Sequence, residues 1–204
     1  MKNRDYKSFA AGTISHVYNR GNNKEKIFLD EQDYKSFLMR LGLGLGIQES
    51  ELQKEFFLPY SRIRITGAKK NDFVLHAFCL MPNHFHLLIE QKKSIPISTL
   101  MLKVCTSYAK YFNKKYSRIG HVFQDQFKSV LIDSNEQLMW ISVYIHGNPA
   151  KDGLVNLPHE HKWSSYNDFV KGRKSSLVNT EFLNSIIGEK NFEKETLTYV
   201  KGDL

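Results

Sequence analysis

The chain has 204 residues, of which 41% are hydrophobic, so it can bury a core as a folded domain. Lysine and arginine number 29 against 21 acidic residues, and the net charge of +8 favours a polyanionic partner, either nucleic acid or an acidic membrane surface. Two cysteines are too few for a disulfide scaffold, and no segment is long and apolar enough to span a bilayer. The first residues lack a signal-peptide core, so we expect a cytoplasmic protein.

The first part of the chain predicts one strand followed by one helix. Ile14–Arg20 has strand character, which puts every second residue, His16 and Tyr18 included, on one face. Residues 30–33 then supply helix-start signals, and apolar residues recur at helical spacing as far as Leu41.

Glycine alternates with leucine from Leu41 to Gly46. Each glycine inside a helix costs roughly 0.8 to 1 kcal/mol relative to alanine, so we expect the helix to break or kink there. We interpret residues 42–70 as an insertion, and their sequence does not predict a function.

Two apolar runs around a short turn predict a β-hairpin. Val74–Leu80 and Phe85–Ile89 are rich in β-branched, aromatic and aliphatic residues, and Met81–Asn83 has turn chemistry. His84 and His86 both belong to the second strand. Because side chains alternate faces along a strand, these histidines point the same way, roughly 7 Å apart at the backbone, while the apolar residues of the strand fill the other face.

The histidine pair allows two interpretations. Two imidazole rings on one strand face can bind a divalent ion and leave other positions open for water or a substrate oxygen. Alternatively, both rings bond to neighbouring groups and bind no metal, which is common for so short a motif. The residues alone leave both interpretations open.

A second helix is predicted over residues 100–116, with an apolar stripe and several basic residues elsewhere on its surface. Aromatic residues, Tyr108 among them, are interleaved with the basic ones. Stacking combined with phosphate neutralisation is how proteins hold single-stranded nucleic acid. The alternative is an ordinary solvated lysine face.

A strand at 127–132 and a helix that begins after Ser134 complete the pattern. We expect that helix to end at His146, because proline at position 149 cannot continue it. Near its end, Tyr144 and Asn148 are four residues apart, so on a continuing turn they share one face with about 6 Å of rise between them. From spacing alone, a buried tyrosine beside a capping asparagine is the favoured interpretation.

The elements follow in the order strand, helix, hairpin, helix, strand, helix, without an internal repeat. This βαββαβ order predicts an α+β fold with the split ferredoxin-like plan, in which a largely antiparallel sheet carries helices on one face. We expect a main domain over residues 1–150 and a C-terminal extension over 151–204 that packs on the same domain.

Five segments carry a resemblance to a known family: Val17–Gly21, Leu80–Glu90, Gly120–Gln124, Tyr144–Ala150 and Trp163–Tyr166. They resemble the HUH single-strand nucleases, in the form of the one-tyrosine transposases of insertion sequences, and are most similar to the REP-associated tyrosine transposases. The resemblance covers about residues 13 to 170. It departs from the family at Gln126, where relatives often carry arginine, which weakens any claim of a phosphate contact there.

The resemblance implies that residues 1–150 are a catalytic domain whose histidine strand is central in the sheet. Tyr144 would attack a scissile phosphate and form a 5′-phosphotyrosine, leaving a free 3′-hydroxyl, and strand transfer could follow without ATP. His84, His86 and Asn148 would hold a divalent ion, Mg²⁺ or Mn²⁺, that stabilises charge on the phosphate oxygens. Free tyrosine has a pKa near 10 and needs such help.

The resemblance also implies a substrate of single-stranded DNA that folds into hairpins at inverted repeats, bound by a monomer or a homodimer. The residues expected to contact DNA are Arg20, Tyr108, Lys110, Lys114, Lys115, Arg118, Gln124 and Lys128. Two other functions stay open. One is a non-mobile protein that binds hairpin DNA, and the other is a metal-dependent phosphodiesterase that uses water as the nucleophile.

Overall fold

Four strands and seven α-helices form in the residues that the computed structural model describes, which are 10–58, 63 and 65–202. The strands are β1 (Thr13–Arg20), β2 (Phe73–Met81), β3 (His84–Gln91) and β4 (Lys128–Ile132). The helices are α1 (Glu31–Gly44), α2 (Glu49–Phe56), α3 (Ile97–Lys115), α4 (Asn135–Lys151), α5 (Tyr166–Val170), α6 (Glu181–Ile187) and α7 (Glu189–Lys201). None of the helices in this part of the chain is long and apolar enough to cross a membrane.

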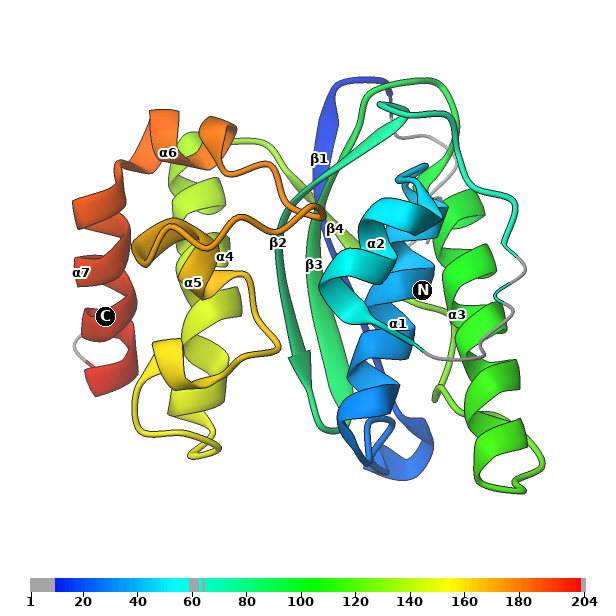
Figure 1. Ribbon diagram of the computed structural model, residues 1–204. Coiled ribbons are helices and arrows are strands. Elements are labelled where there is room, and N and C mark those ends of the chain that lie inside the picture. Colours follow the sequence, from blue (N-terminus) through cyan, green and yellow to red (C-terminus); the bar gives the residue numbers. More distant parts are fainter. Residues whose placement is uncertain (1–9, 59–62, 64, 203–204) are drawn as a thin grey trace, which may run out of the picture.

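The four strands form one antiparallel sheet in the order β2-β3-β1-β4 (Figure 1). Helix α1 connects β1 to the β2–β3 hairpin, and α3 connects the hairpin to β4. This is the split βαββαβ plan, so the predicted fold class is confirmed. The histidine strand β3 is central, with β2 on one side and β1 on the other.

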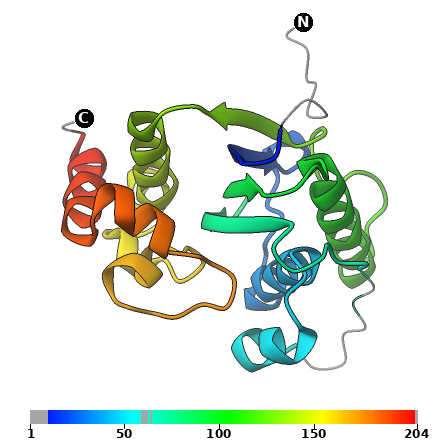
Figure 2. The same ribbon diagram turned by 90° about the horizontal axis from the view of Figure 1, so that it is seen from above.

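Helices α1 and α3 cover one face of the sheet (Figure 2). Phe85, Leu87 and Ile89 of β3 are fully buried in the core on this face, as the alternation along the strand predicted. The ring of Phe37 from α1 lies 4.9 Å from the ring of Phe85. Burial of each of these apolar side chains stabilises the fold by about 1.5–3 kcal/mol. The core on this face therefore holds the histidine strand in place.

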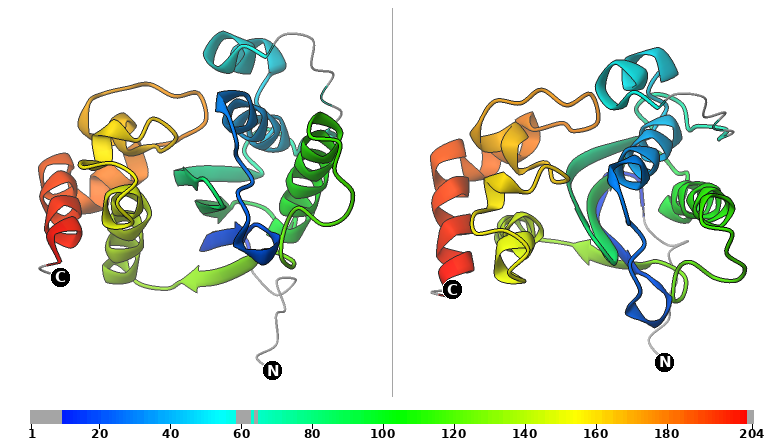
Figure 3. Two further views of the ribbon diagram at one scale, coloured as in Figure 1. Left: turned by 90° about the horizontal axis from the view of Figure 1, so that it is seen from below. Right: turned by 60° about the horizontal axis from the view of Figure 1, so that its bottom comes forward.

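The other face is covered by α4 and by α5, α6 and α7, so the sheet lies between two groups of helices (Figure 3). The two helices of the βαββαβ unit, α1 and α3, share one face as predicted, and the helices that cover the other face all follow β4. They pack there because Cys79 and Leu88 make this face apolar as well, and Ile145 of α4 buries them. Residues 151–202 pack here against α4 and the sheet, whereas the domain boundary at residue 150 stays a prediction.

The chain returns after α4 to the free edge of β2. The backbone N–H of Leu80 donates to the carbonyl of Trp163 at 2.9 Å, and the N–H of Ser165 donates to the carbonyl of Phe78 at 3.0 Å. These bonds satisfy backbone groups that an open edge strand would leave without partners. The Trp163–Tyr166 motif therefore joins the C-terminal part of the chain to the sheet.

Helix α1 runs unbroken through Gly42, so a break at that glycine is wrong, but the helix ends at Gly44, inside the run where the break was predicted. Both glycines lie where another helix approaches closely. A Cβ atom at Gly42 would lie 2.5 Å from the Leu52 side chain of α2, and one at Gly44 would lie 2.8 Å from Leu100 of α3. Close packing with α2 and α3 offsets the low helix propensity of glycine. That residues 42–70 are an insertion stays a prediction, and part of this segment lies outside the described residues.

Helix α4 continues to Lys151, so the predicted end at His146 is also wrong. Pro149 lies in the last turn, where its missing N–H deprives only one carbonyl of a helical bond and its fixed φ is already helical. The continuous helix confirms that Tyr144 and Asn148 are separated by one helical turn.

Candidate active site

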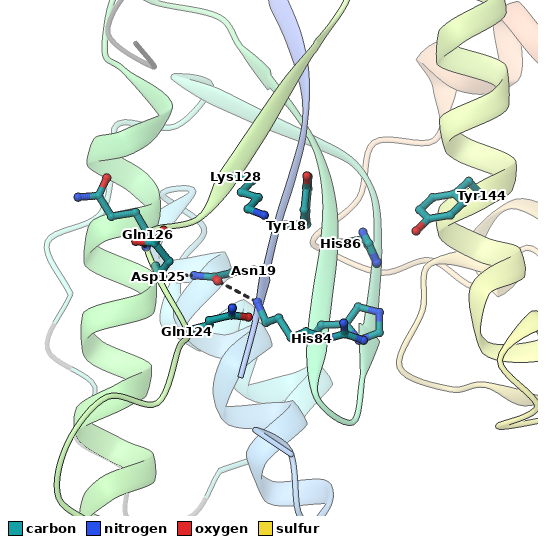
Figure 4. A pocket seen from close by; sticks show the side chains of 10 residues that line it. Tyr18, Asn19, His84, His86, Gln124, Asp125, Gln126, Lys128 and Tyr144 are labelled. Atoms are coloured by element: carbon teal, nitrogen blue, oxygen red, sulfur yellow. Dashed lines mark hydrogen bonds between the residues drawn. The ribbon is translucent and has the colours of Figure 1, made fainter. Parts of the chain in front are cut away.

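The candidate site is a cavity of about 430 Å³ between the end of the sheet and α4 (Figure 4). It is lined by Tyr18, Asn19, Arg20, His84, His86, Gln124, Asp125, Gln126, Lys128 and Tyr144. Strand pairing explains how residues distant in sequence meet here, because Tyr18 of β1 is opposite His86 of β3. Lys128 of β4 is opposite Tyr18 on its other side.

The two histidines of β3 lie together, as predicted. Their ring centroids are 5.0 Å apart and the ring planes are nearly perpendicular, at 89°. Burial lowers the pKa of His84 to about 4, with nearby Arg20 adding to the shift. Burial also lowers the pKa of His86 well below its ordinary value, aided by the neighbouring His16 and His84. Both rings are therefore neutral at pH 7, the form in which imidazole binds a metal ion.

The orientation of His84 is set by its neighbour in the hairpin turn. Its Nδ1 lies 2.6 Å from Oδ1 of Asn83. Because an amide oxygen only accepts hydrogen bonds, Nδ1 carries the proton and donates it. The lone pair of the neutral ring is then on Nε2.

Tyr144 of α4 meets the histidines edge to face. Its ring centroid is 5.5 Å from that of His86 at an interplanar angle of 85°, and Figure 4 shows the hydroxyl pointing from α4 toward β3. One turn earlier on the helix, Trp140 stacks on the tyrosine ring at 5.3 Å and 11°. Among the described residues, no hydrogen bond to the Tyr144 hydroxyl is present. The hydroxyl is thus held near the histidines by ring contacts alone.

Asn148 is buried on the same helix but does not line the cavity. Its Nδ2 atom is buried and has no hydrogen-bond partner among the described groups. The same is true of Nε2 of His86. The described part of the chain holds no cluster of three or more histidine, cysteine, aspartate or glutamate side chains arranged for a metal. The predicted ligand set of two histidines and one amide stays a prediction.

The structure separates the predicted DNA contacts into two groups. Arg20, Gln124 and Lys128 line the cavity. The other basic residues, Lys110, Lys114, Lys115 and Arg118, belong to α3 or follow it and do not line the cavity. Two of them are paired within the protein: Lys115 bonds to Asp30 and Asp33, and Arg118 bonds to Glu25. Their contact with DNA stays a prediction.

For Tyr108 the prediction of a DNA contact is wrong. Its side chain is fully buried in the core, and its hydroxyl donates to the backbone carbonyl of Ile27. It packs against Phe28 and Phe37 of the same core, with ring centroids 5.5 and 5.2 Å away. A ring enclosed in this way cannot stack on a base. The apolar stripe of the helix contained this residue, and that signal outweighed its place among basic residues.

Three other residues of the site were not predicted. His16 of β1 lies beside His86, with ring centroids 5.0 Å apart. Tyr18 lines the cavity, and Trp140 leaves 52% of its side chain exposed beside Tyr144. The alternation of β1 and the four-residue spacing on α4 were the available signals. Neither could tell a site residue from an ordinary face of an element.

Comparison with known proteins supports the resemblance expected from the sequence. Residues 50–148 match the profile of the IS200-like transposases, and this region contains His84, His86 and Tyr144. The fold resembles the solved structure of a REP-associated tyrosine transposase bound to a REP hairpin, with a TM-score of 0.55 and 15% sequence identity. That similarity covers 84% of this chain and 93% of the other. A comparison with curated protein sequences found no match.

Proposed function

We propose that this chain, whose residues 50–148 match the IS200-like transposases, cleaves and rejoins single-stranded DNA that carries hairpin elements. The match to this family supports an enzyme that acts on DNA. The observation that carries the finer proposal is the contact of the Tyr144 ring with His86 at the wall of a polar cavity. A nucleophile beside candidate metal ligands is what transesterification of a phosphodiester requires.

In the proposed reaction the Tyr144 hydroxyl loses its proton and its oxygen attacks the scissile phosphorus. A new bond forms between this oxygen and phosphorus as the bond from phosphorus to the 3′ oxygen breaks. The departing 3′ oxygen takes up a proton and becomes a hydroxyl. The DNA fragment on the other side of the cut stays attached to the tyrosine through its 5′ phosphate. One phosphoester replaces another, so a second strand's 3′-hydroxyl can reverse the step without ATP.

The residues present fit a divalent ion. His86 Nε2 is a buried ring nitrogen for which the described residues offer no partner. Asn148 would bind through its amide oxygen, because the amide nitrogen is only a donor. The neutral His84 ring, with its proton on Nδ1, has a free lone pair on Nε2. In the proposal these three side chains hold Mg²⁺ or Mn²⁺. When bound, the ion would polarise the phosphate and stabilise its developing negative charge.

The DNA is proposed to enter along the basic side of the cavity, where Arg20 and Lys128 can neutralise phosphates. The structural neighbour was solved with a REP hairpin, which supports hairpin DNA as the partner. Whether the chain acts as a monomer or a homodimer, and its cytoplasmic location, stay predictions.

Incubation of the protein with end-labelled hairpin DNA and Mn²⁺ tests the proposal. We expect a denaturant-resistant adduct of protein and DNA, and peptide mass analysis should find the nucleotide on Tyr144. Binding of the hairpin without cleavage would support the non-mobile DNA-binding protein instead. Cleavage without an adduct would support a phosphodiesterase that uses water.

Calorimetry with Mn²⁺ tests the metal site separately. The double variant His84→Ala with His86→Ala should lose Mn²⁺ binding, because both proposed imidazole ligands are removed. His121→Ala is the matched control, since His121 is an exposed histidine outside the cavity. Unchanged binding in the double variant would show that the metal site is misassigned.

A further inference from the structure

A buried pair of histidines lies behind the candidate metal site. Nε2 of His16 and Nδ1 of His86 are 2.8 Å apart, and the rings stack with an interplanar angle of 20°. Only 6% of His16 and 5% of His86 is exposed. At this depth an unsatisfied ring nitrogen is costly, so the short contact is a hydrogen bond with one proton between the two nitrogens.

That proton can belong to either ring. The two arrangements differ in whether Nε2 of His86 carries a proton or a lone pair. If His16 donates from Nε2, then the neutral ring of His86 carries its own proton on Nε2 and has no lone pair there. If His86 donates from Nδ1, its Nε2 keeps a lone pair. Only the second arrangement lets His86 bind a metal ion through Nε2.

We propose that His16 is a positioning residue that accepts the Nδ1 proton of His86 and thereby keeps the Nε2 lone pair of His86 available for a divalent ion. The inference rests on the proposed metal-dependent function. His16 would touch neither the ion nor the DNA, and it would act only through His86.

Two features of the site favour this arrangement. Nε2 of His86 is buried with no hydrogen-bond partner among the described groups, which suits a lone pair directed at a cation. His84 shows the same design, because Asn83 accepts its Nδ1 proton and leaves Nε2 free. Metal-binding histidines commonly donate their second ring nitrogen to a fixed acceptor, which sets both the tautomer and the ring orientation.

Two substitutions at position 16 separate positioning from simple packing. His16→Gln keeps a hydrogen-bond acceptor at a similar distance from the backbone, whereas His16→Leu keeps an apolar side chain of similar bulk and removes the acceptor. Calorimetry should show that Mn²⁺ affinity falls about 10- to 100-fold in His16→Leu, the range typical for loss of such a partner. Affinity in His16→Gln should stay within about threefold of wild type, because the hydrogen bond is retained.

A matched control is His76→Leu. His76 of β2 is another buried strand histidine, and it lies outside the cavity. Its Nε2 lies 3.0 Å from the carboxylate of Glu90 on β3. Its loss should lower the urea midpoint of unfolding without changing Mn²⁺ affinity. If His76→Leu weakens Mn²⁺ binding as much as His16→Leu does, general destabilisation explains the effect and the proposal is wrong.

The tautomer of His86 in the wild-type protein gives a readout that needs no variant. Nitrogen-15 NMR without metal should find the proton of His86 on Nδ1. A proton on Nε2 would overturn the proposal, as would equal losses of Mn²⁺ affinity in His16→Gln and His16→Leu. If the proposed function is wrong, the wild-type protein will form no DNA adduct. If the wild type forms the adduct but His16→Leu binds Mn²⁺ as tightly as wild type, only the inference about His16 is wrong.

Discussion

Ser165 is predicted to be a stabilising link between the C-terminal segment, the sheet and the helix that carries Tyr144. Its Oγ accepts the backbone N–H of Phe78 at 2.9 Å and lies 2.7 Å from Nε2 of His146. Because His146 Nδ1 donates to the carbonyl of Ser142, its Nε2 has the lone pair and the serine hydroxyl donates to it. Ser165 and His146 are both fully buried.

Replacement of Ser165 by alanine leaves the N–H of Phe78 and Nε2 of His146 buried without this partner. Each such loss costs about 1–3 kcal/mol, so we expect the two together to lower the free energy of unfolding by about 2–6 kcal/mol. Urea unfolding measures this directly, provided that the slope with denaturant is unchanged. The matched control is Ser164→Ala, since the Ser164 hydroxyl accepts one backbone bond, from Tyr166 at 3.0 Å. We expect that variant to lose about 1 kcal/mol.

The Ser165→Ala variant should also slow the reaction. His146 is two residues from Tyr144 on α4, so loss of its anchor loosens the helix that carries the proposed nucleophile. At a temperature where both variants are folded, the DNA adduct should form more slowly in Ser165→Ala than in Ser164→Ala. Equal stability losses in the two variants, or a loss below about 1 kcal/mol in Ser165→Ala, would refute this account of the link.

Three further predictions follow from the site. Tyr144→Phe should abolish the DNA adduct while the unfolding free energy stays within about 1 kcal/mol of wild type, because no described group bonds the hydroxyl; an adduct on another tyrosine would contradict this. Trp140→Ala should weaken binding of hairpins with an unpaired flank by about 5- to 150-fold if the exposed ring stacks on a base, measured by fluorescence anisotropy, whereas the exposed Phe57→Ala should not. Burial lowers the pKa of His146 to about 4, so its contribution to stability is complete above pH 6.5 and falls as the pH drops toward 4, where the unfolded chain binds a proton that the native ring does not. Urea midpoints at pH 7 and pH 5 should therefore reveal a loss of about 2 kcal/mol that His146→Gln lacks.

Local patterns were enough to predict the four strands, the helices α1, α3 and α4, and the candidate reactive residues. Alternation along β3 puts His84 and His86 on one face, since a strand has a period of two residues whatever its neighbours are. The four-residue spacing of Tyr144 and Asn148 likewise follows from the helical repeat. The order of the elements predicted the split sheet, because short connections and antiparallel pairing leave few other arrangements for βαββαβ.

Contacts between distant segments decided the rest. Gly42 and Gly44 remain helical because α2 and α3 pack against them, and no window of local sequence contains those helices. Tyr108 can be a core residue because its hydroxyl donates a hydrogen bond to the carbonyl of Ile27, a residue 81 positions earlier in the chain. Propensity is worth less than about 1 kcal/mol per residue, whereas burial and hydrogen bonding in the core exceed it.

The hydrogen bond between His16 and His86 joins residues 70 positions apart. The register of β1 against β3 brings these two histidines together, because Tyr18 is directly opposite His86 and His16 is the diagonal neighbour of His86. A shift of one residue would turn His16 to the other face of the sheet. The sequence by itself therefore determined that two histidines and a tyrosine are the candidate reactive groups. Only the tertiary structure decided which ring nitrogen of His86 has a partner, because strand register is a property of the packed sheet.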